Sequence, residues 1–392
     1  MLFGLLGGAV DLYLYKNHSE TLQNIADGAA LSAVGGAALK GWSKASAEAT
    51  ATNHVNAHLP AQKNGTIYTP IVDVDETNRT VKVTIDQDHH GYFVMGYFKH
   101  SPQIRVQASA QASGSTNICV IGLSQREEAT ISLDSNSRMT AGDCAVYSNS
   151  LSRFGLKSMS NSVLTAQLSC SAGGYAGSSR NFIGDVVTDC PETDDPLASV
   201  LPASTASGRW YDREVKDRTT TLSPGTYFGG LKIDGNANVT LSPGIYVFRD
   251  GSFIVDSNAR VSGRGVSLVF EGEDAGFEFK SNVVVDLEAP VEGQPMAGLL
   301  VYQRRDAERA EFLIESRYTR KLLGTLYMPN GDFMVKADDK VAEASAYTAI
   351  VARTIRLESS SNLVLNTDYD ATRVPVPLGL GPTSDGKVRL TR

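Results

Sequence analysis

Two clusters of carboxylates are the groups in this chain whose spacing could support acid–base chemistry. They are Asp332, Asp338 and Asp339 in one segment, and Glu271, Glu273 and Asp274 in another. Cleavage of a polysaccharide needs such clustered carboxylates, as general acid and base or as ligands of calcium, often beside a basic residue. Both clusters are also typical of solvated turns, and we favour that interpretation. We therefore predict no catalytic residue and no enzyme.

Other residue types that commonly carry chemistry form no recognisable site. Asp86, Asp88, His89 and His90 lie together, but adjacent side chains of a strand point in opposite directions, so the two histidines would rarely share one ion. All six histidines precede residue 101, so serine and cysteine nucleophiles lack a nearby histidine. The sequence contains no nucleophile elbow, phosphate loop or zinc-protease motif. We predict no metal site and no cofactor.

The four cysteines lie within one stretch of the chain. Cys119, Cys144, Cys170 and Cys190 follow one another at spacings of 25, 26 and 20. Zinc sites usually use closer pairs, so this even number favours two disulfides in an oxidising compartment, with four buried thiols as the alternative. By sequence neighbourhood we pair the first with the second and the third with the fourth, and the other two pairings remain open.

The charge of the chain is mildly acidic, with a formal net charge of -7 over 392 residues. No run of lysine and arginine forms a basic face, which argues against nucleic-acid binding. Positive charge is concentrated between residues 304 and 321, where it alternates with acidic residues. The basic residues are Arg304, Arg305, Arg309, Arg317, Arg320 and Lys321, and the acidic ones are Asp306, Glu308, Glu311 and Glu315. We expect a self-paired surface, with a patch for an anionic glycan or a partner as the alternative.

The sequence pattern of residues 1–60 predicts helical structure. Residues 1–10 are almost wholly apolar, but a bilayer needs about 20 such residues. We interpret residues 1–15 as the second half of a membrane segment whose first half is absent from this chain, with a buried amphipathic helix as the alternative. Small residues follow at helical spacing and would let another helix approach closely. The predicted helix-packing residues are Gly4, Gly8, Ala26, Ala29, Ala30 and Ala33.

Residues 61–112 change to the period of strands. Val81, Val83 and Ile85 alternate with polar residues, as in a half-buried strand. Asn78 and Arg79 precede this run and predict a hairpin with residues 71–74. An aromatic-rich run at 92–98 and a further alternating run at 104–108 complete a small antiparallel sheet.

From about residue 113 a short motif returns, in which a small residue and an asparagine precede an aliphatic residue or methionine. The asparagines are Asn136, Asn161, Asn236, Asn258, Asn282 and Asn362, and their numbers differ successively by 25, 75, 22, 24 and 80. These gaps are close to one or three turns of a solenoid with about 22–27 residues per turn. Asparagine tolerates the left-handed backbone of a corner and can stack its amide in a ladder. We predict a parallel β-helix rather than an antiparallel sandwich.

Several segments resemble the TadE/TadG-like pilus assembly proteins. The first is Gly-Ala-Val-Asp at 8–11, followed at 22–31 by Leu-Gln-Asn-Ile-Ala-Asp-Gly-Ala-Ala-Leu, which departs from the family's form at Ile25, Gly28 and Ser32. The others follow in collinear order. They are residues 143–150, Asp195-Pro196-Leu197, the two Ser-Pro-Gly-x-Tyr corners at 223–227 and 242–246, and Gly-Thr-Leu-Tyr-Met-Pro-Asn at 324–330.

The resemblance implies a TadG-like structural and adhesive component of a tight-adherence pilus. Its fold would be mainly β: a right-handed parallel β-helix preceded by a long N-terminal helix with a small pilin-like antiparallel sheet. We expect a helical segment at 1–60, a sheet packing on it at 61–112, the β-helix at 113–375 and a C-terminal tail at 376–392. A membrane-anchored carbohydrate-active enzyme on a β-helix is the alternative function.

The resemblance also implies partners and a location. The N-terminal helix would contact TadE-like minor pilins and the major pilin, and its first segment would contact the membrane. The β-helix could present a surface for a receptor or glycan. The protein would be anchored in the inner membrane of a bacterium with a periplasmic body, or exported at the pilus tip.

Overall fold

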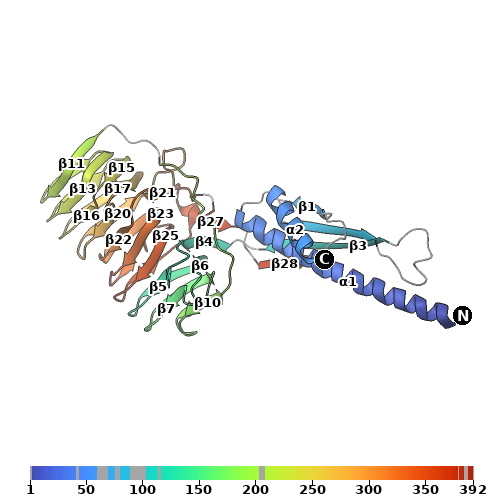
Figure 1. The fold of residues 1–392 in the computed structure, drawn as a ribbon. Coiled ribbons are helices and arrows are strands. Elements are labelled where there is room, and N and C mark those ends of the chain that lie inside the picture. Colours follow the sequence, from blue (N-terminus) through green and yellow to red (C-terminus); the bar gives the residue numbers. More distant parts are fainter. Residues whose placement is uncertain are drawn as a thin grey trace. The chain divides into compact units, whose positions relative to one another are not determined.

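The structure is a computed structural model and divides into two units. It describes residues 2–40, 44–59, 69–75, 80–88, 103–113, 116–202, 208–377, 379–383 and 387–391. Unit 1 comprises residues 1–115 and 383–392, and unit 2 comprises residues 116–382. The chain is mainly β, with two helices in unit 1 (Figure 1).

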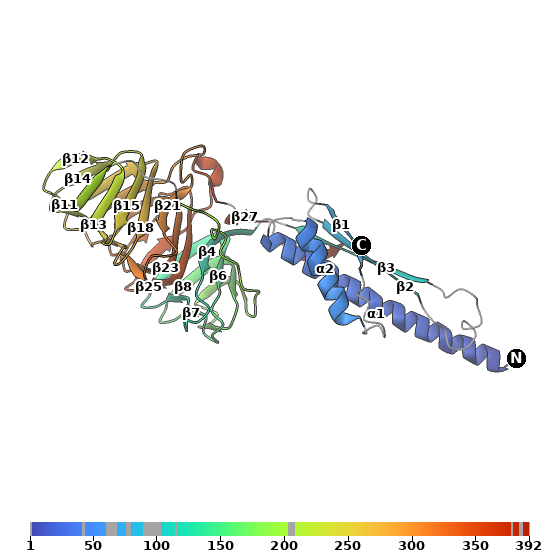
Figure 2. The same ribbon diagram turned by 45° about the horizontal axis from the view of Figure 1, so that its top comes forward.

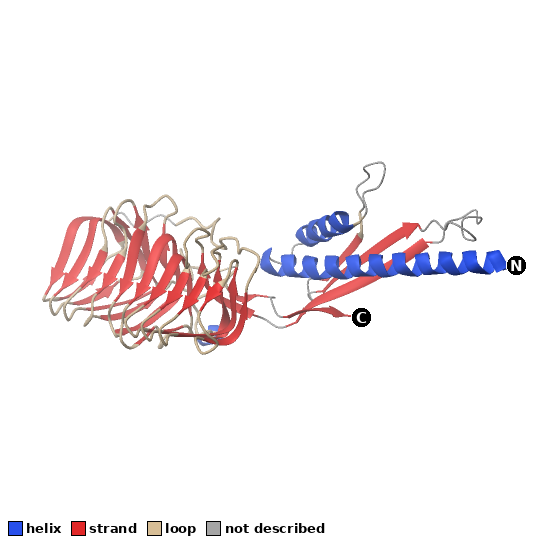
Figure 3. Ribbon diagram, turned by 60° about the horizontal axis from the view of Figure 1, so that its bottom comes forward, coloured by secondary structure: helices blue, strands red, loops and turns tan. Residues whose placement is uncertain are grey.

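Unit 1 consists of two helices and a four-stranded antiparallel sheet. The helices are α1 (Leu2–Lys40) and α2 (Lys44–His58). The sheet has the order β1 (Ile71–Asp75), β2 (Thr80–Asp88), β3 (Gln103–Ser113) and β28 (Lys387–Thr391). Val83 lies opposite Val72 on one side and Ala108 on the other. Figure 3 shows the long helix α1 running along this sheet and continuing past the strands toward the N-terminus.

The buried core of unit 1 begins at Leu22 of α1 and comes from the helices, β2 and β3, and Tyr15 of α1 with Val72 and Val74 of β1 pack against it as partly buried residues. The sheet contributes Val81, Val83, Ile85, Ile104, Val106, Ala108 and Ala110, and α2 contributes Ala47, Ala51 and Val55. The alternation predicted for Val81, Val83 and Ile85 is therefore that of a strand with one buried face.

The small residues predicted to let another helix approach closely pack inside unit 1, where that helix is α2. Ala26, Ala29, Ala30 and Ala33 are completely buried in its core. Gly28 shows how closely α2 approaches α1, because a Cβ there would lie 2.5 Å from Nε2 of His54. The small face thus serves contact between two helices of the same chain. Gly4 and Gly8 lie in α1, upstream of this core.

Three further expectations concern unit 1. The pairing of β1 with β2 confirms the predicted antiparallel hairpin, whose turn lies outside the described residues, as do the aromatic run at 92–98 and His89 and His90. The prediction of a C-terminal tail at 376–392 is wrong for its last part, because β28 pairs antiparallel with β3 and so belongs to the sheet. None of the described helices combines the length and the apolar character needed to cross a bilayer.

Unit 2 contains the remaining strands, which form two sequence blocks. The first block is β4 (Thr116–Gly122), β5 (Ile131–Leu133), β6 (Arg138–Ser148), β7 (Leu156–Ser158), β8 (Val163–Ser171), β9 (Tyr175–Ala176) and β10 (Phe182–Val187). The second begins with β11 (Arg209–Lys216), β12 (Thr219–Leu222), β13 (Gly225–Asp234), β14 (Asn238–Leu241), β15 (Gly244–Arg249), β16 (Phe253–Val255), β17 (Arg260–Arg264), β18 (Val266–Glu271) and β19 (Phe277–Phe279). It continues with β20 (Val284–Glu288), β21 (Leu299–Gln303), β22 (Ala310–Ile314), β23 (Tyr318–Val335), β24 (Lys340–Val341), β25 (Thr348–Leu357), β26 (Asn362–Val364) and β27 (Gly381–Thr383), with a short 3-10 helix at Tyr369–Ala371.

Parallel pairing at a short sequence repeat organises these strands into a stack. Gly244 pairs with Val266, and Val301 pairs with Leu326, so in both cases the partner lies one predicted repeat further along the chain. Leu268 and Val301 also pair but are more widely separated in the sequence, because residues 289–298 form an excursion between β20 and β21. The repeat length predicted from the asparagines thus equals the sequence separation of paired residues on most neighbouring strands. These strands lie side by side in Figure 2.

The chain enters this stack in its middle. From β4 it passes through β6 and β8 to β10, each pairing with the one before. Residues 188–208 then lead to β11, which pairs with β13, and the second block runs back until β25 pairs with β4 and β5, and β26 with β6. The wide gap between Asn161 and Asn236 is therefore not three turns, as predicted, but this crossing from the β10 end to the β11 end.

Aromatic side chains at equivalent positions fill the interior of the stack. Phe253, Phe277, Phe312 and Phe333 are register partners on successive strands and are almost fully buried. The rings of Phe277 and Phe312 meet edge to face with centroids 5.2 Å apart, a favourable aromatic geometry. A second column is formed by Trp210, Tyr227, Phe248 and Phe270.

The asparagine corners follow the register only in part. Asn236, Asn258 and Asn282 each lie two positions before the register partners Asn238, Arg260 and Val284, and so occupy equivalent corners. Asn136 and Asn161 do the same, with left-handed φ of 61° and 62°. Asn362 does not belong to this column, because it pairs with Arg138 itself. Among the described residues the main chain joins successive corners, as from the Asn258 amide to the Gly235 carbonyl (3.0 Å), and aspartates join others, as where Asp234 accepts from the Ser257 hydroxyl (2.7 Å). No hydrogen bond among these described corners joins two asparagine side chains.

Two disulfides and one outer segment hold neighbouring turns together. The disulfides join Cys119 with Cys144 and Cys170 with Cys190, the predicted pairing. From Cys190 the segment 191–201, which we name the strap, crosses the outside of the stack. Its Asp195 accepts a hydrogen bond from the Tyr327 hydroxyl (2.7 Å) and pairs with Arg305 (2.9 Å). The Tyr302 hydroxyl donates to the Val200 carbonyl (2.7 Å).

The strap contacts generate a stability prediction. Asp195→Ala leaves the Tyr327 hydroxyl and the Arg305 guanidinium without their carboxylate, so we expect a loss of about 1–3 kcal/mol in the free energy of unfolding of unit 2. Asp194→Ala, in the exposed neighbouring residue, should change it by less than about 0.5 kcal/mol. Urea unfolding, with hydrogen exchange of strap amides as the readout, measures the free energy of unfolding of both variants. Equal losses in Asp195→Ala and Asp194→Ala would contradict the role given to Asp195.

Candidate ligand-binding groove

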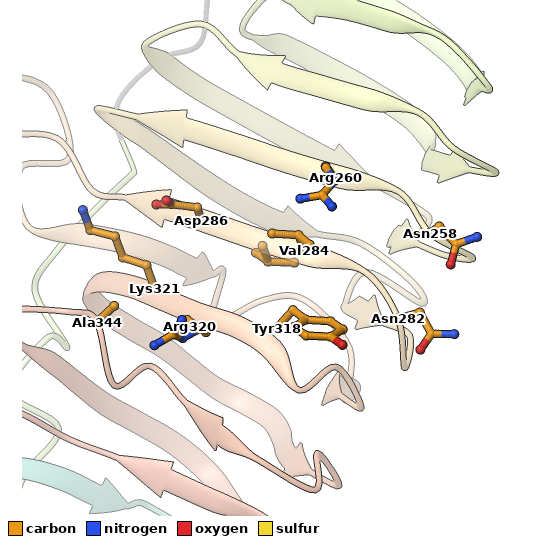
Figure 4. A pocket seen from close by; sticks show the side chains of 10 residues that line it. Asn258, Arg260, Asn282, Val284, Asp286, Tyr318, Arg320, Lys321 and Ala344 are labelled. Atoms are coloured by element: carbon orange, nitrogen blue, oxygen red, sulfur yellow. The ribbon is translucent and has the colours of Figure 1, made fainter.

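A groove of about 920 Å³ lies on the outer face of β17, β20 and the first residues of β23 (Figure 4). Arg260, Val284 and Tyr318 are register partners on these three strands, so their side chains form a row across the groove. Its lining is completed by Asn258, Asn282, Val285, Asp286, Arg320, Lys321 and Ala344. Two predicted ladder residues, Asn258 and Asn282, thus lie at an exposed groove rather than in an amide ladder.

A bulge in β23 gives the groove its basic character. Val284 pairs with Tyr318, but Asp286, two positions on, pairs with Lys321, three positions on. The extra residue breaks the alternation of the strand, so Arg320 and Lys321 both avoid the core while Thr319 and Leu322 are buried. A bulge redirects side chains in this way because two residues oppose one on the partner strand.

The cations of the groove differ in whether a carboxylate already holds them. Lys321 Nζ lies 2.5 Å from Glu288, and Arg320 Nε donates to Glu343 at 2.8 Å. Arg260 is exposed, and within the described part of the chain its guanidinium has no ion pair or hydrogen bond. The groove therefore offers one guanidinium with all its donors available.

The arrangement suits binding rather than bond cleavage. Tyr318 is 45% exposed and presents a ring face beside Val284, a surface on which a flat apolar group can rest. The amides of Asn258 and Asn282 can donate and accept hydrogen bonds. The single carboxylate of the lining, Asp286, has Lys321 as its register partner, and one carboxylate alone does not supply an acid and a base.

The basic residues of the charged segment 304–321 form ion pairs, as expected. Most of them pair with carboxylates outside the segment rather than with the acidic residues of the segment itself. Only Arg304 uses a local carboxylate, that of Asp306, at 2.8 Å. The others reach carboxylates outside the segment: Arg305 to Asp195 of the strap, Arg309 to Asp332, Arg317 to Asp338, Arg320 to Glu343 and Lys321 to Glu288. Most of these cations therefore link adjacent turns of the stack, with partners 21 to 33 residues apart in the sequence, whereas Arg305 reaches a partner 110 residues away.

The carboxylates considered above for acid–base chemistry are engaged in such contacts. Asp332 accepts hydrogen bonds from Arg309 (2.7 Å) and Thr354 (2.5 Å) and pairs with Arg353, which also holds Glu127 at 2.6 Å. Asp338 pairs with Arg317, and Glu271 pairs with Arg249 and Arg304. Asp339 accepts a hydrogen bond from the amide of Lys340, while Glu273 and Asp274 are exposed corner residues.

The protonation of Asp332 fits a structural role. Burial alone would raise its pKa, but hydrogen bonds from Thr354 and Arg309 and the charge of Arg353 outweigh burial and hold the pKa below the ordinary value of 3.8. The hydrogen bond from Arg353 likewise lowers the pKa of Glu127 below 4.5. Both groups are ionised at neutral pH, where a general acid would need to hold a proton. Across the described residues no cluster of potential metal ligands is present.

This network predicts an acid-sensitive stability. Because both folded-state pKa values lie below the unfolded ones, the network stabilises fully above the unfolded values and is lost as the pH falls through the folded ones. Asp332→Asn should cost about 2 kcal/mol at pH 7 and flatten the fall in unfolding free energy below about pH 4.5. Asp306→Asn, in a carboxylate whose side chain is 70% exposed, should cost less than about 0.5 kcal/mol. Urea titrations at several pH values test this, and a pH profile unchanged in Asp332→Asn would contradict it.

The groove, and Asp332 with Arg309 and Arg353, lie within the part of the chain that matches a known family, whereas Glu127 lies outside it. Comparison with curated proteins and with solved structures gives no match. The family described as "Domain of unknown function (DUF7305)" matches residues 165–372, which include β11–β26 and the strap. This match covers more than half of the 392 residues, and the chain therefore belongs to the DUF7305 family.

Proposed function

We propose that this chain is a TadG-like component of a bacterial tight-adherence pilus, with a structural and adhesive role. The observation that carries the proposal is the two-part character of α1. From Leu22 onward its apolar side chains are buried against α2, β2 and β3, whereas Val10, Leu12 and Tyr13 are 43%, 60% and 70% exposed. The helix of 39 residues is about 58 Å long. In its first part Asp11 is buried and Tyr15 packs on the core, so the apolar side chains left exposed there belong to one face of the helix.

Exposed apolar side chains on a helix stabilise contact with another apolar surface. In a pilus that surface would be the helices of TadE-like minor pilins and the major pilin, and at the membrane it would be the acyl chains. The predicted locations, an inner-membrane anchor with a periplasmic body or the pilus tip, both use this segment. The resemblance at residues 8–11 and 22–31 gives independent support from the sequence.

We also infer that the parallel stack of unit 2 is a right-handed β-helix. The registers described between strands of the stack, from β4–β6 to β23–β25, are parallel, and the antiparallel bridge between Tyr347 and Thr367 lies outside these strands. Crossover connections between parallel strands of one sheet are right-handed in about 98% of cases. Such a stack presents a long outer surface whose side chains can vary without disturbing the core. This suits an adhesive role, and the alternative of an enzyme gains no support from the carboxylates that arginines hold.

The proposal predicts that charge on the exposed apolar part of α1 prevents incorporation into pili. Burying a leucine or tyrosine side chain stabilises by about 2 kcal/mol, so Leu12→Glu or Tyr13→Glu should lower labelled protein on pili by about tenfold or more. Lys16→Glu changes charge at a side chain that is already 77% exposed and serves as the matched control.

Immunogold labelling of intact piliated cells, compared with a deletion strain, measures incorporation. Circular dichroism of the purified variants checks that each is folded. If Leu12→Glu and Tyr13→Glu label pili as strongly as the unchanged protein does, the helix does not join the pilus and the proposal is wrong.

A further inference from the structure

We propose that the groove across β17, β20 and β23 binds an acidic polysaccharide, that is, a glycan carrying carboxylates. The inference rests on the proposed function in one respect: it names the class of surface ligand that the adhesive role would use. It is carried by the row of Arg260, Val284 and Tyr318 and by the state of the charges around that row.

The first step concerns charge. A cation that already holds a carboxylate contributes little to binding a second anion, because the ligand must compete with the existing pair. Arg320 and Lys321 are in that state, but Arg260 is not. A guanidinium matches a carboxylate with two parallel hydrogen bonds. Arg260 is therefore the group at which an anion of the ligand would sit.

The second step concerns the rest of the ligand. Neighbouring strands are about 4.8 Å apart, so Arg260 and Tyr318 are separated by roughly 10 Å at the main chain. A ligand that reaches both must offer a carboxylate at one end and an apolar face at the other. It must also offer groups that form hydrogen bonds with the side-chain amides of Asn258 and Asn282, which line the same groove. A short chain of sugar acids has all three features, since each ring carries hydroxyls, an apolar face and a carboxylate.

An acidic peptide is the competing class of ligand. It would also satisfy Arg260, but an extended peptide is recognised through a free strand edge, and an acidic motif through a cluster of arginines. The other cations of this groove, Arg320 and Lys321, are already paired. The edges of β17 and β20 are not free, because each of these strands pairs on both sides within the stack. The outer face of a paired strand offers side chains only, which favours the glycan.

The experiment uses the purified full chain and isothermal titration calorimetry with three probes. These are alginate oligosaccharides as acidic glycan, dextran oligosaccharides as neutral glycan and poly-glutamate as acidic peptide. We expect binding of alginate that weakens as salt is raised, with weaker or no binding of the other two. Arg260→Ala should lower the affinity for alginate by about tenfold or more, and Tyr318→Ala should lower it as well.

Arg264→Ala is the control for a cation of the same strand that lies outside the lining and already holds a carboxylate: its side chain is 84% exposed and pairs with Glu288 at 3.2 Å. It should change affinity by less than about threefold. No binding of alginate, equal binding of dextran or poly-glutamate, or equal losses for Arg260→Ala and Arg264→Ala would each overturn the inference. The titration needs no pilus, so the two proposals can fail separately. Normal pilus labelling without alginate binding refutes only this inference. Alginate binding without labelled pili refutes only the proposed function.

Discussion

Unit 2 depends on parallel main-chain pairing between turns that cannot bury their own apolar sides. Each turn contributes short strands such as β16, β19 and β22, of three to five residues. One such strand buries too little surface to offset its loss of conformational entropy. In the stack, however, Phe277 has Phe253 on one side and Phe312 on the other. Register therefore decides stability, because a shift by one residue would turn the phenylalanine column outward.

The same constraint explains where the specific side-chain contacts lie. The pairing of β25 with β4 joins segments from opposite ends of unit 2, so it closes a long loop at an entropic cost that main-chain pairing of a few residues must offset. Glu127 and Arg353 lie close to this junction and connect its two sides, and Arg353 continues to Asp332. The strap adds contacts across the turns of Tyr302 and Tyr327. Ion pairs and hydrogen bonds thus support the two places where the chain brings distant segments together.

Local patterns in the sequence predicted local structure well. Alternation at 81–85 gave a strand, the period of the asparagine motif gave parallel neighbours, and the cysteine neighbourhood gave both disulfides. The order of the turns could not be predicted, because every turn has similar corners and nothing in a corner says which turn lies above it. For the same reason Asn362 was predicted to lie above the other asparagines. Its motif matches theirs, but its register is shifted by two residues, so it pairs with Arg138 rather than Asn136. The sequence placed Arg320 and Lys321 in a candidate patch for an anionic glycan or a partner but missed the rest of the groove, because only the register of the strands brings Arg260 and Tyr318 into one row.

The paired surface also determines what the groove can recognise. Surface ion pairs contribute little stability each, but they neutralise cations that would otherwise attract any anion. Along β23, Arg317, Arg320 and Lys321 are held by carboxylates. Discrimination then depends on the one guanidinium that is left available, Arg260, and on the uncharged groups that surround it. A ligand attracted by charge alone would gain only one contact, whereas a ligand with an apolar face and hydroxyls would gain the whole row from Arg260 to Tyr318. A mostly neutralised surface is therefore the condition under which a single arginine can be selective.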